Sequence, residues 1–199
     1  MDMRVFDLFK IGVGPSSSHT VGPMIAARRF LLECLNLDQA HKVQVALYGS
    51  LALTGLGHAT DKAVLLGLMG ETPQDVVPDT VDDKLAELAQ SGVMHLLGKV
   101  KVDFDILDDV LWHKKEVLPG HPNGLRFSLT RTDGSVHEQT FYSTGGGFIY
   151  TEEELNTNAS TVAVPAVSVP YPFGTMAELL AHGKSTGLSL AALLRANEL

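Results

Sequence analysis

Two histidines lie beside glycine-rich segments, each at the point where a helix is expected to begin. His19 follows a Gly/Ser/Pro loop, and His58 follows the turn Gly55-Leu56-Gly57. An imidazole titrates at about pH 6.5, which suits it to accept a proton as a general base. The residues alone leave two interpretations open. His58 either faces a cleft as a base, or it is an ordinary loop histidine beside a helix that Thr60 or Asp61 caps.

The loop before His19 carries several hydroxyl groups. Ser16, Ser17 and Ser18 precede His19, and Thr20 follows it. The free N–H groups and partial positive charge of a helix N-terminus favour a carboxylate or phosphate ligand. The alternative is a serine that only caps the helix. The glycine spacing differs from that of a Walker A loop, and no lysine follows it.

Two later segments also combine turn residues with polar groups. Ser143 stands just before the consecutive glycines Gly145, Gly146 and Gly147, whose backbone could bind a ligand or simply form a flexible turn. The segment Gly120–Gly124 contains His121 and Asn123. This second segment is either an ordinary Pro/Asn-Gly turn or a source of ligands for a small polar molecule.

The elements that must position these residues mix helices and hairpin strands without a regular strand–helix alternation, which predicts an α+β fold with a mixed sheet packed with helices. Helices are expected from about His19–Gly22 to Leu35, at Thr60–Leu68 and Asp82–Gln90, from Thr175 onward, and at Ser189–Leu199. Strands are expected at Arg4–Phe9 (a strand or a turn), Lys42–Tyr48, Leu125–Thr130, His137–Ser143 and Thr161–Val169. A turn is expected at Gly49–Gly57 and a solvated loop at Asp108–Asp109.

Composition excludes several classes of function. The 199 residues carry a formal net charge of −8, which argues against a nucleic-acid partner. No apolar run is long enough for a membrane span and no secretory signal is visible. Because one cysteine cannot form an internal disulfide, we expect a cytoplasmic protein. The single cysteine, Cys34, is expected to be a buried thiol. One thiolate cannot hold an iron–sulfur cluster, and no histidine pair has metal-ligand spacing, so no metal site is expected in this chain.

In their order along the chain, four segments together resemble the N-terminal β domain of the iron–sulfur-dependent L-serine dehydratases (L-serine ammonia-lyases): Phe6–Met24, Gly49–Asp61, His121–Gly124 and Tyr142–Phe148. The resemblance implies conversion of L-serine to pyruvate and ammonia without pyridoxal phosphate, as in serine degradation and gluconeogenesis. It implies a [4Fe-4S] cluster held by cysteines of a C-terminal α domain, and a homodimer. The implied fold is similar to the allosteric substrate-binding domain of D-3-phosphoglycerate dehydrogenase.

The resemblance also implies a domain division and roles for residues. Residues 1–180 would form the β domain, and residues 181–199 a linker or helix leading to the absent cluster-binding domain, so this chain alone is expected to be inactive. His58 would be the general base, with His19 as the second catalytic candidate. His121 and Asn123 would form a separate allosteric serine site. Substrate binding would fall to Ser16, Ser17, Ser18, Thr20, Thr60, Asp61, Ser143, Gly145, Gly146 and Gly147.

Two other functions stay open at this point. The chain could be a serine-sensing regulatory module without catalytic residues. A hydrolase that uses Ser17 or Ser18 as its nucleophile is the weaker alternative, because the sequence has no Gly-X-Ser-X-Gly elbow.

Overall fold

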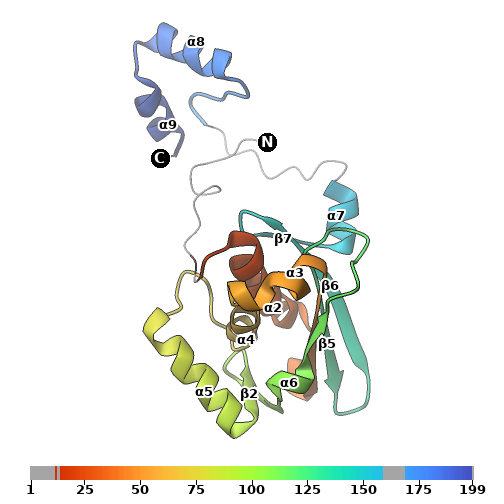
Figure 1. Cartoon of the computed structure of the whole chain (residues 1–199). Helices are drawn as coiled ribbons and strands as arrows, with labels where there is room; N and C mark the ends of the chain where they lie inside the picture. The colour runs from red at the N-terminus through yellow and green to blue at the C-terminus, as the bar shows by residue number, and fades with distance from the viewer. Residues whose placement is uncertain (1–11, 13, 159–168, 199) are drawn as a thin grey trace. The chain divides into compact units, whose positions relative to one another are not determined.

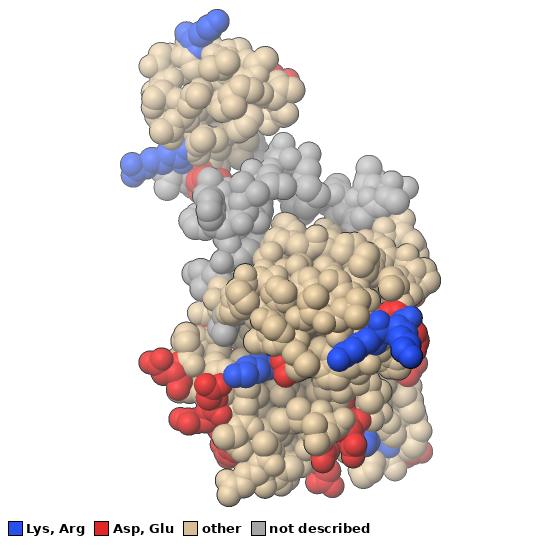
Figure 2. All heavy atoms as spheres, viewed as in Figure 1, with Lys and Arg blue, Asp and Glu red and all other residues tan. Residues whose placement is uncertain are grey.

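The computed structural model describes residues 12, 14–158 and 169–198 (Figure 1 and Figure 2). Contacts divide the chain into two compact units: one is Ile11–Ser160, and the other combines Met1–Lys10 with Thr161–Leu199. The strand or turn expected at Arg4–Phe9 lies outside the described residues, as does nearly all of the run expected at Thr161–Val169.

The larger unit is built on a mixed five-stranded sheet with the order β4-β1-β5-β6-β7. The β1–β4 pair is parallel and the other three pairs are antiparallel. This sheet, packed with helices, confirms the predicted α+β class. The strands are β1 (Ala40–Tyr48), β4 (Val110–His113), β5 (Gly124–Arg131), β6 (Val136–Gly145) and β7 (Phe148–Thr151).

Helices cover the core of this unit. The helices α2 (Gly22–Glu33) and α3 (Gly49–Thr54) pack on the sheet, α4 (Thr60–Leu68) packs against α2, and α5 (Val81–Ser91) lies farther out, against α4 (Figure 1). Phe30 of α2 is fully buried and stacks on Phe127 of β5, with ring centres 5.2 Å apart. Burying a side chain of this size stabilises the fold by roughly 1.5–3 kcal/mol. This packing fixes α2 against β5, and so fixes the segment that precedes α2 in the chain.

Most expected elements are confirmed, but two expectations are wrong. The segment expected to be a turn, Gly49–Gly57, forms α3 and the start of a 3-10 turn, η3 (Gly55–His58). Asp109 is not solvated: it is only 2% exposed, and its carboxylate pairs with Lys42 at 2.9 Å. The short elements β2 (Val93–Leu96), β3 (Val100–Asp103), α6 (Ile106–Asp109) and β4 were not expected.

The smaller unit, as far as it is described, contains the helices α8 (Met176–Thr186) and α9 (Leu190–Glu198). Thr175 and Glu178 form a reciprocal capping box at the start of α8. Both helices were expected, whereas the division proposed after residue 180 falls inside α8 and stays a prediction. Within the described ranges, none of the helices has the length and apolar character that crossing a bilayer requires.

Candidate functional site

His19 and His58 lie side by side in the larger unit, although they are 39 positions apart in the sequence. Their ring centres are 4.8 Å apart. Two threonines cross-link the segments: Thr20 Oγ1 donates to the carbonyl of His58 at 2.8 Å, and Thr60 Oγ1 donates to the carbonyl of His19 at 2.5 Å. Both threonines are buried. The two histidine segments therefore form one structural unit.

The orientation of His58 makes one ring nitrogen available as a base. Its Nδ1 lies 2.9 Å from the carbonyl oxygen of Thr54. Because a carbonyl can only accept, Nδ1 carries the proton, and the neutral ring has its lone pair on Nε2. No residue in the described ranges forms a hydrogen bond to this Nε2. The next residue, Ala59, has a φ of 53°, a left-handed conformation that is costly for a residue with a Cβ.

His19 is held between two hydroxyl groups. Its Nδ1 lies 2.9 Å from Ser18 Oγ, and its Nε2 lies 3.0 Å from Ser50 Oγ. Burial lowers the pKa of His19 below its usual value, the neighbouring charge of His58 lowers it further, and the interaction with Ser50 opposes both. His19 is therefore neutral at neutral pH. Nothing in the local sequence singles out Ser50, because the glycines around it indicate a turn rather than the start of α3.

The three consecutive glycines form a turn that only glycine adopts easily. Their φ values are 102°, 61° and 76° for Gly145, Gly146 and Gly147, all in the left-handed region. Gly146 N–H donates to Ser17 Oγ at 3.2 Å. This triple-glycine turn, between β6 and β7, therefore lies against the serine loop (Ser16–Ser18).

Within the serine loop, the hydroxyls of Ser16 and Ser18 already have local partners. Ser16 Oγ accepts from the backbone N–H of His19 at 3.1 Å, as an N-cap does, and lies 3.4 Å from Ser18 Oγ. The chain then continues through a π-helical turn, η1 (Ser17–Val21), into α2. Asp61 lies in the first turn of α4, where the helix dipole favours an acidic side chain.

The segment with His121 and Asn123 contacts the same group of loops. Asn123 and Ser143 are buried and joined twice: Ser143 N–H donates to the Asn123 carbonyl, and Asn123 Nδ2 donates to the Ser143 carbonyl, each at 3.0 Å. Ser50 N–H donates to the Pro122 carbonyl at 2.9 Å. His121 Nδ1 accepts from the Asn123 N–H at 3.1 Å, so its neutral ring carries the proton on Nε2.

The hydroxyl of Ser143 is unusual in this arrangement. It is fully buried, and among the described residues it has no hydrogen-bond partner. The structure thus brings together all four segments singled out from the sequence. It commits the hydroxyls of Thr20 and Thr60 to the backbone, while the roles of these residues toward a ligand stay predictions.

The residues present do not fit an iron–sulfur cluster. Cys34 is 8% exposed at the end of α2, and Arg131 Nη2 lies 3.6 Å from its Sγ. Across the described ranges, no three His, Cys, Asp or Glu side chains are grouped so that they could hold a metal ion. A hollow of about 450 Å³ is lined in part by His41 and Lys42, at the start of β1. It is separate from the histidines, because Ser50, the partner of His19, follows the other end of β1.

Comparison with known proteins gives consistent matches. Residues 4–154 match the model of the serine dehydratase beta chain family. The chain is 45% identical over its full length to an L-serine dehydratase of Streptomyces coelicolor. It is 43% identical to the L-serine dehydratase TdcG of Escherichia coli and 37% identical to an L-serine dehydratase of Haemophilus influenzae, each over 99% of this chain. It spans 43–44% of the length of these three relatives.

Proposed function

Because the chain belongs to the serine dehydratase beta chain family, we propose that it supplies the substrate-binding loops and the general base of an L-serine ammonia-lyase. The observation that supports this proposal most strongly is the paired geometry of His19 and His58 beside the serine loop, which in turn contacts the triple-glycine turn. The ligand is an amino acid whose carboxylate suits hydroxyl and backbone N–H donors.

In this proposal the carboxylate of L-serine binds between the hydroxyls of Ser16–Ser18 and the backbone of Gly145–Gly147. Thr20 and Thr60 hold the loops together, and Asp61 and Ser143 complete the surroundings of the substrate. Nε2 of His58 takes the proton from the α-carbon, and neutral His19 lies beside the His58 ring. Loss of the β-hydroxyl as water gives an enamine, which tautomerises to an imine and hydrolyses to pyruvate and ammonia.

The [4Fe-4S] cluster that the family resemblance implies cannot be held by one buried thiol. We therefore place its ligands outside this sequence, in a part that corresponds to the remaining length of the relatives, and we assign no step of the reaction to the cluster. No role for pyridoxal phosphate is proposed. The homodimer, the cytoplasmic location and the part in gluconeogenesis stay predictions, as does the similarity to the D-3-phosphoglycerate dehydrogenase domain.

A second candidate function is regulation by L-serine at His121 and Asn123. It is favoured by the bonds from this segment to Ser50 and Ser143, because binding there would act directly on the partner of His19 and on the strand that leads to the triple-glycine turn. Such coupling is typically worth about 1–3 kcal/mol. In this second function the chain would sense serine, and His58 would contribute nothing to turnover.

Titration of the ¹⁵N-labelled chain with L-serine tests the first step. We expect saturable shifts of the Gly145–Gly147 amides and of the His58 ring nitrogens. L-serine methyl ester, which lacks the carboxylate, should give much weaker shifts. Shifts confined to His121 and Asn123 would favour the regulatory function, and equal responses to the acid and its ester would contradict carboxylate binding.

A further inference from the structure

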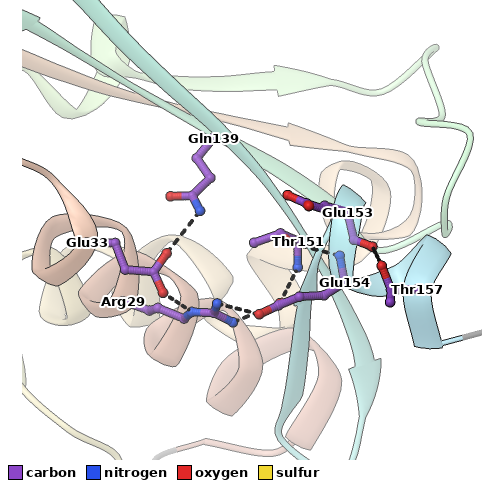
Figure 3. A network of polar contacts seen from close by, with 7 residues as sticks. All are labelled: Arg29, Glu33, Gln139, Thr151, Glu153, Glu154 and Thr157. Carbon is purple, nitrogen blue, oxygen red and sulfur yellow. Dashed lines mark hydrogen bonds and ion pairs between the residues drawn. The ribbon is translucent and has the colours of Figure 1, made fainter. Parts of the chain in front are cut away.

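A polar network on α2 connects this helix to the hairpin β6–β7, away from the histidines. The guanidinium of Arg29 binds both carboxylate oxygens of Glu154, through Nη1 at 3.0 Å and Nη2 at 2.6 Å, and its Nε donates to Glu33 at 2.6 Å (Figure 3). Bidentate binding of this kind fixes both partners in orientation as well as distance. The same guanidinium holds the pKa of Glu154 below its usual range.

Glu154 also closes the junction between β7 and α7 (Glu152–Asn158). Its carboxylate accepts from the backbone N–H of Thr151 at 2.8 Å, and its own N–H donates to Thr151 Oγ1 at 3.1 Å. This reciprocal pair is a capping box. One carboxylate therefore ties the end of β7 to α2.

The neighbouring strand, β6, is tied to α2 at the same level. Glu33 accepts from Gln139 Nε2 at 3.0 Å, and the Arg29 guanidinium lies 5.6 Å from the centre of the Phe141 ring. Phe141 is opposite Thr151 in the β6–β7 ladder. Figure 3 shows Arg29 and Glu33 on the helix reaching toward both strands of the hairpin. Both strands are thus anchored to α2 near the base of the hairpin.

The tip of the same hairpin is the triple-glycine turn, and the chain that enters α2 is the serine loop. Their contact is the bond from Gly146 N–H to Ser17 Oγ. The network fixes the base of the hairpin relative to α2, so it also limits where the tip can lie relative to the start of that helix. A substitution at Arg29 or Glu154 should therefore weaken the contact between the triple-glycine turn and the serine loop.

We propose that Arg29 and Glu154 are a positioning pair that holds the triple-glycine turn in register with the serine loop, and so sets the affinity of the site for a carboxylate. The identity of the ligand rests on the proposed function, whereas the positioning itself does not. Neither side chain is assigned a contact with the substrate.

The test measures exchange of the Gly146 amide by NMR in the 199-residue chain. In Arg29→Met and in Glu154→Gln we expect this amide to exchange about tenfold faster, which corresponds to about 1.4 kcal/mol. Exchange in the double variant should be no faster than in either single variant, because both substitutions remove the same Arg29–Glu154 interaction. Arg29→Lys keeps the positive charge but cannot bind both carboxylate oxygens in the same way, so the Gly146 amide should be partly protected from exchange in this variant.

The matched control is Lys62→Met, which breaks the exposed ion pair with Asp82 on α4 and α5. It should leave Gly146 unchanged. Glu154→Gln keeps an oxygen that can accept from Thr151, so it remains informative if Arg29→Met does not fold. Unchanged Gly146 exchange in a folded Glu154→Gln variant, with changes restricted to α7, would overturn the proposal.

A parallel titration with L-serine separates the two claims. We expect about tenfold weaker binding by Glu154→Gln than by the wild-type chain, by the same reasoning. If the wild-type chain does not bind L-serine, the proposed function fails, while the exchange of Gly146 still decides the positioning.

Discussion

Replacing Asn123 by alanine tests whether its segment supports the fold or serves only a ligand. Asn123 is 8% exposed, and its Nδ2 donates to the Ser143 carbonyl at 3.0 Å. Truncation removes this donor from a buried carbonyl, which costs about 1–3 kcal/mol. For a unit of this size each 1 kcal/mol lowers Tm by about 2–4 °C, so a mid-range loss of ~2 kcal/mol predicts a decrease of about 4–8 °C.

The assay is thermal unfolding without ligand, followed by circular dichroism. His121→Ala is the matched control, since His121 is only half-buried and its ring makes one bond, to the Asn123 N–H. It should lower Tm by less than Asn123→Ala. A Tm of Asn123→Ala equal to that of the wild-type chain would refute the reasoning and leave Asn123 as a ligand-binding residue alone.

Four further predictions concern the pKa of His19, the acid stability that Glu154 contributes, the glycine turn and the cluster. By NMR, His58→Ala should raise the pKa of His19 only part of the way to its usual value, because burial is the larger cause of the shift; no rise would contradict the pairing. Folding lowers the pKa of Glu154. The ionised carboxylate therefore stabilises the fold at pH values above the pKa of the unfolded state, and this stability is lost as the pH falls through the pKa of the folded state. Glu154→Gln should thus flatten the loss of stability in acid, which pH-dependent urea unfolding would measure. Gly146→Ala and Gly134→Ala both place alanine at positive φ and should each cost about 1–2 kcal/mol, but only Gly146→Ala should weaken L-serine binding in the NMR titration. Anaerobic reconstitution of this chain with iron and sulfide should give no cluster absorbance and no pyruvate from L-serine, and turnover by the chain alone would contradict the placement of the cluster ligands.

Sequence patterns predicted the elements that have strong local signals. The apolar spacing of α2 and α4 and the alternation in β1 are properties of neighbouring residues. The same holds for the glycine and hydroxyl segments, whose backbone freedom and donors are visible in the residue types.

What the sequence missed depends on distant contacts. Ser50 matters because β1 ends beside the Pro122 turn. Asp109 is buried at the end of α6, where Lys42 and Gln44 of β1 bind its carboxylate. A pattern of neighbouring residues cannot show that a threonine hydroxyl will be used by a carbonyl 38 or 41 residues away. Nor could it show that Arg29 and Glu154, 125 residues apart, would meet.

The central claim is that His58 is the base that takes the α-proton of L-serine. The most direct measurement is the kcat for pyruvate formation in a dehydratase that contains this chain, comparing His58→Ala with His95→Ala, an exposed histidine of β2. We predict a loss of about 10²–10⁴-fold for His58→Ala, the usual effect of removing a positioned base, and no loss for His95→Ala. A His58→Ala enzyme with an intact cluster and near-normal kcat would contradict the account.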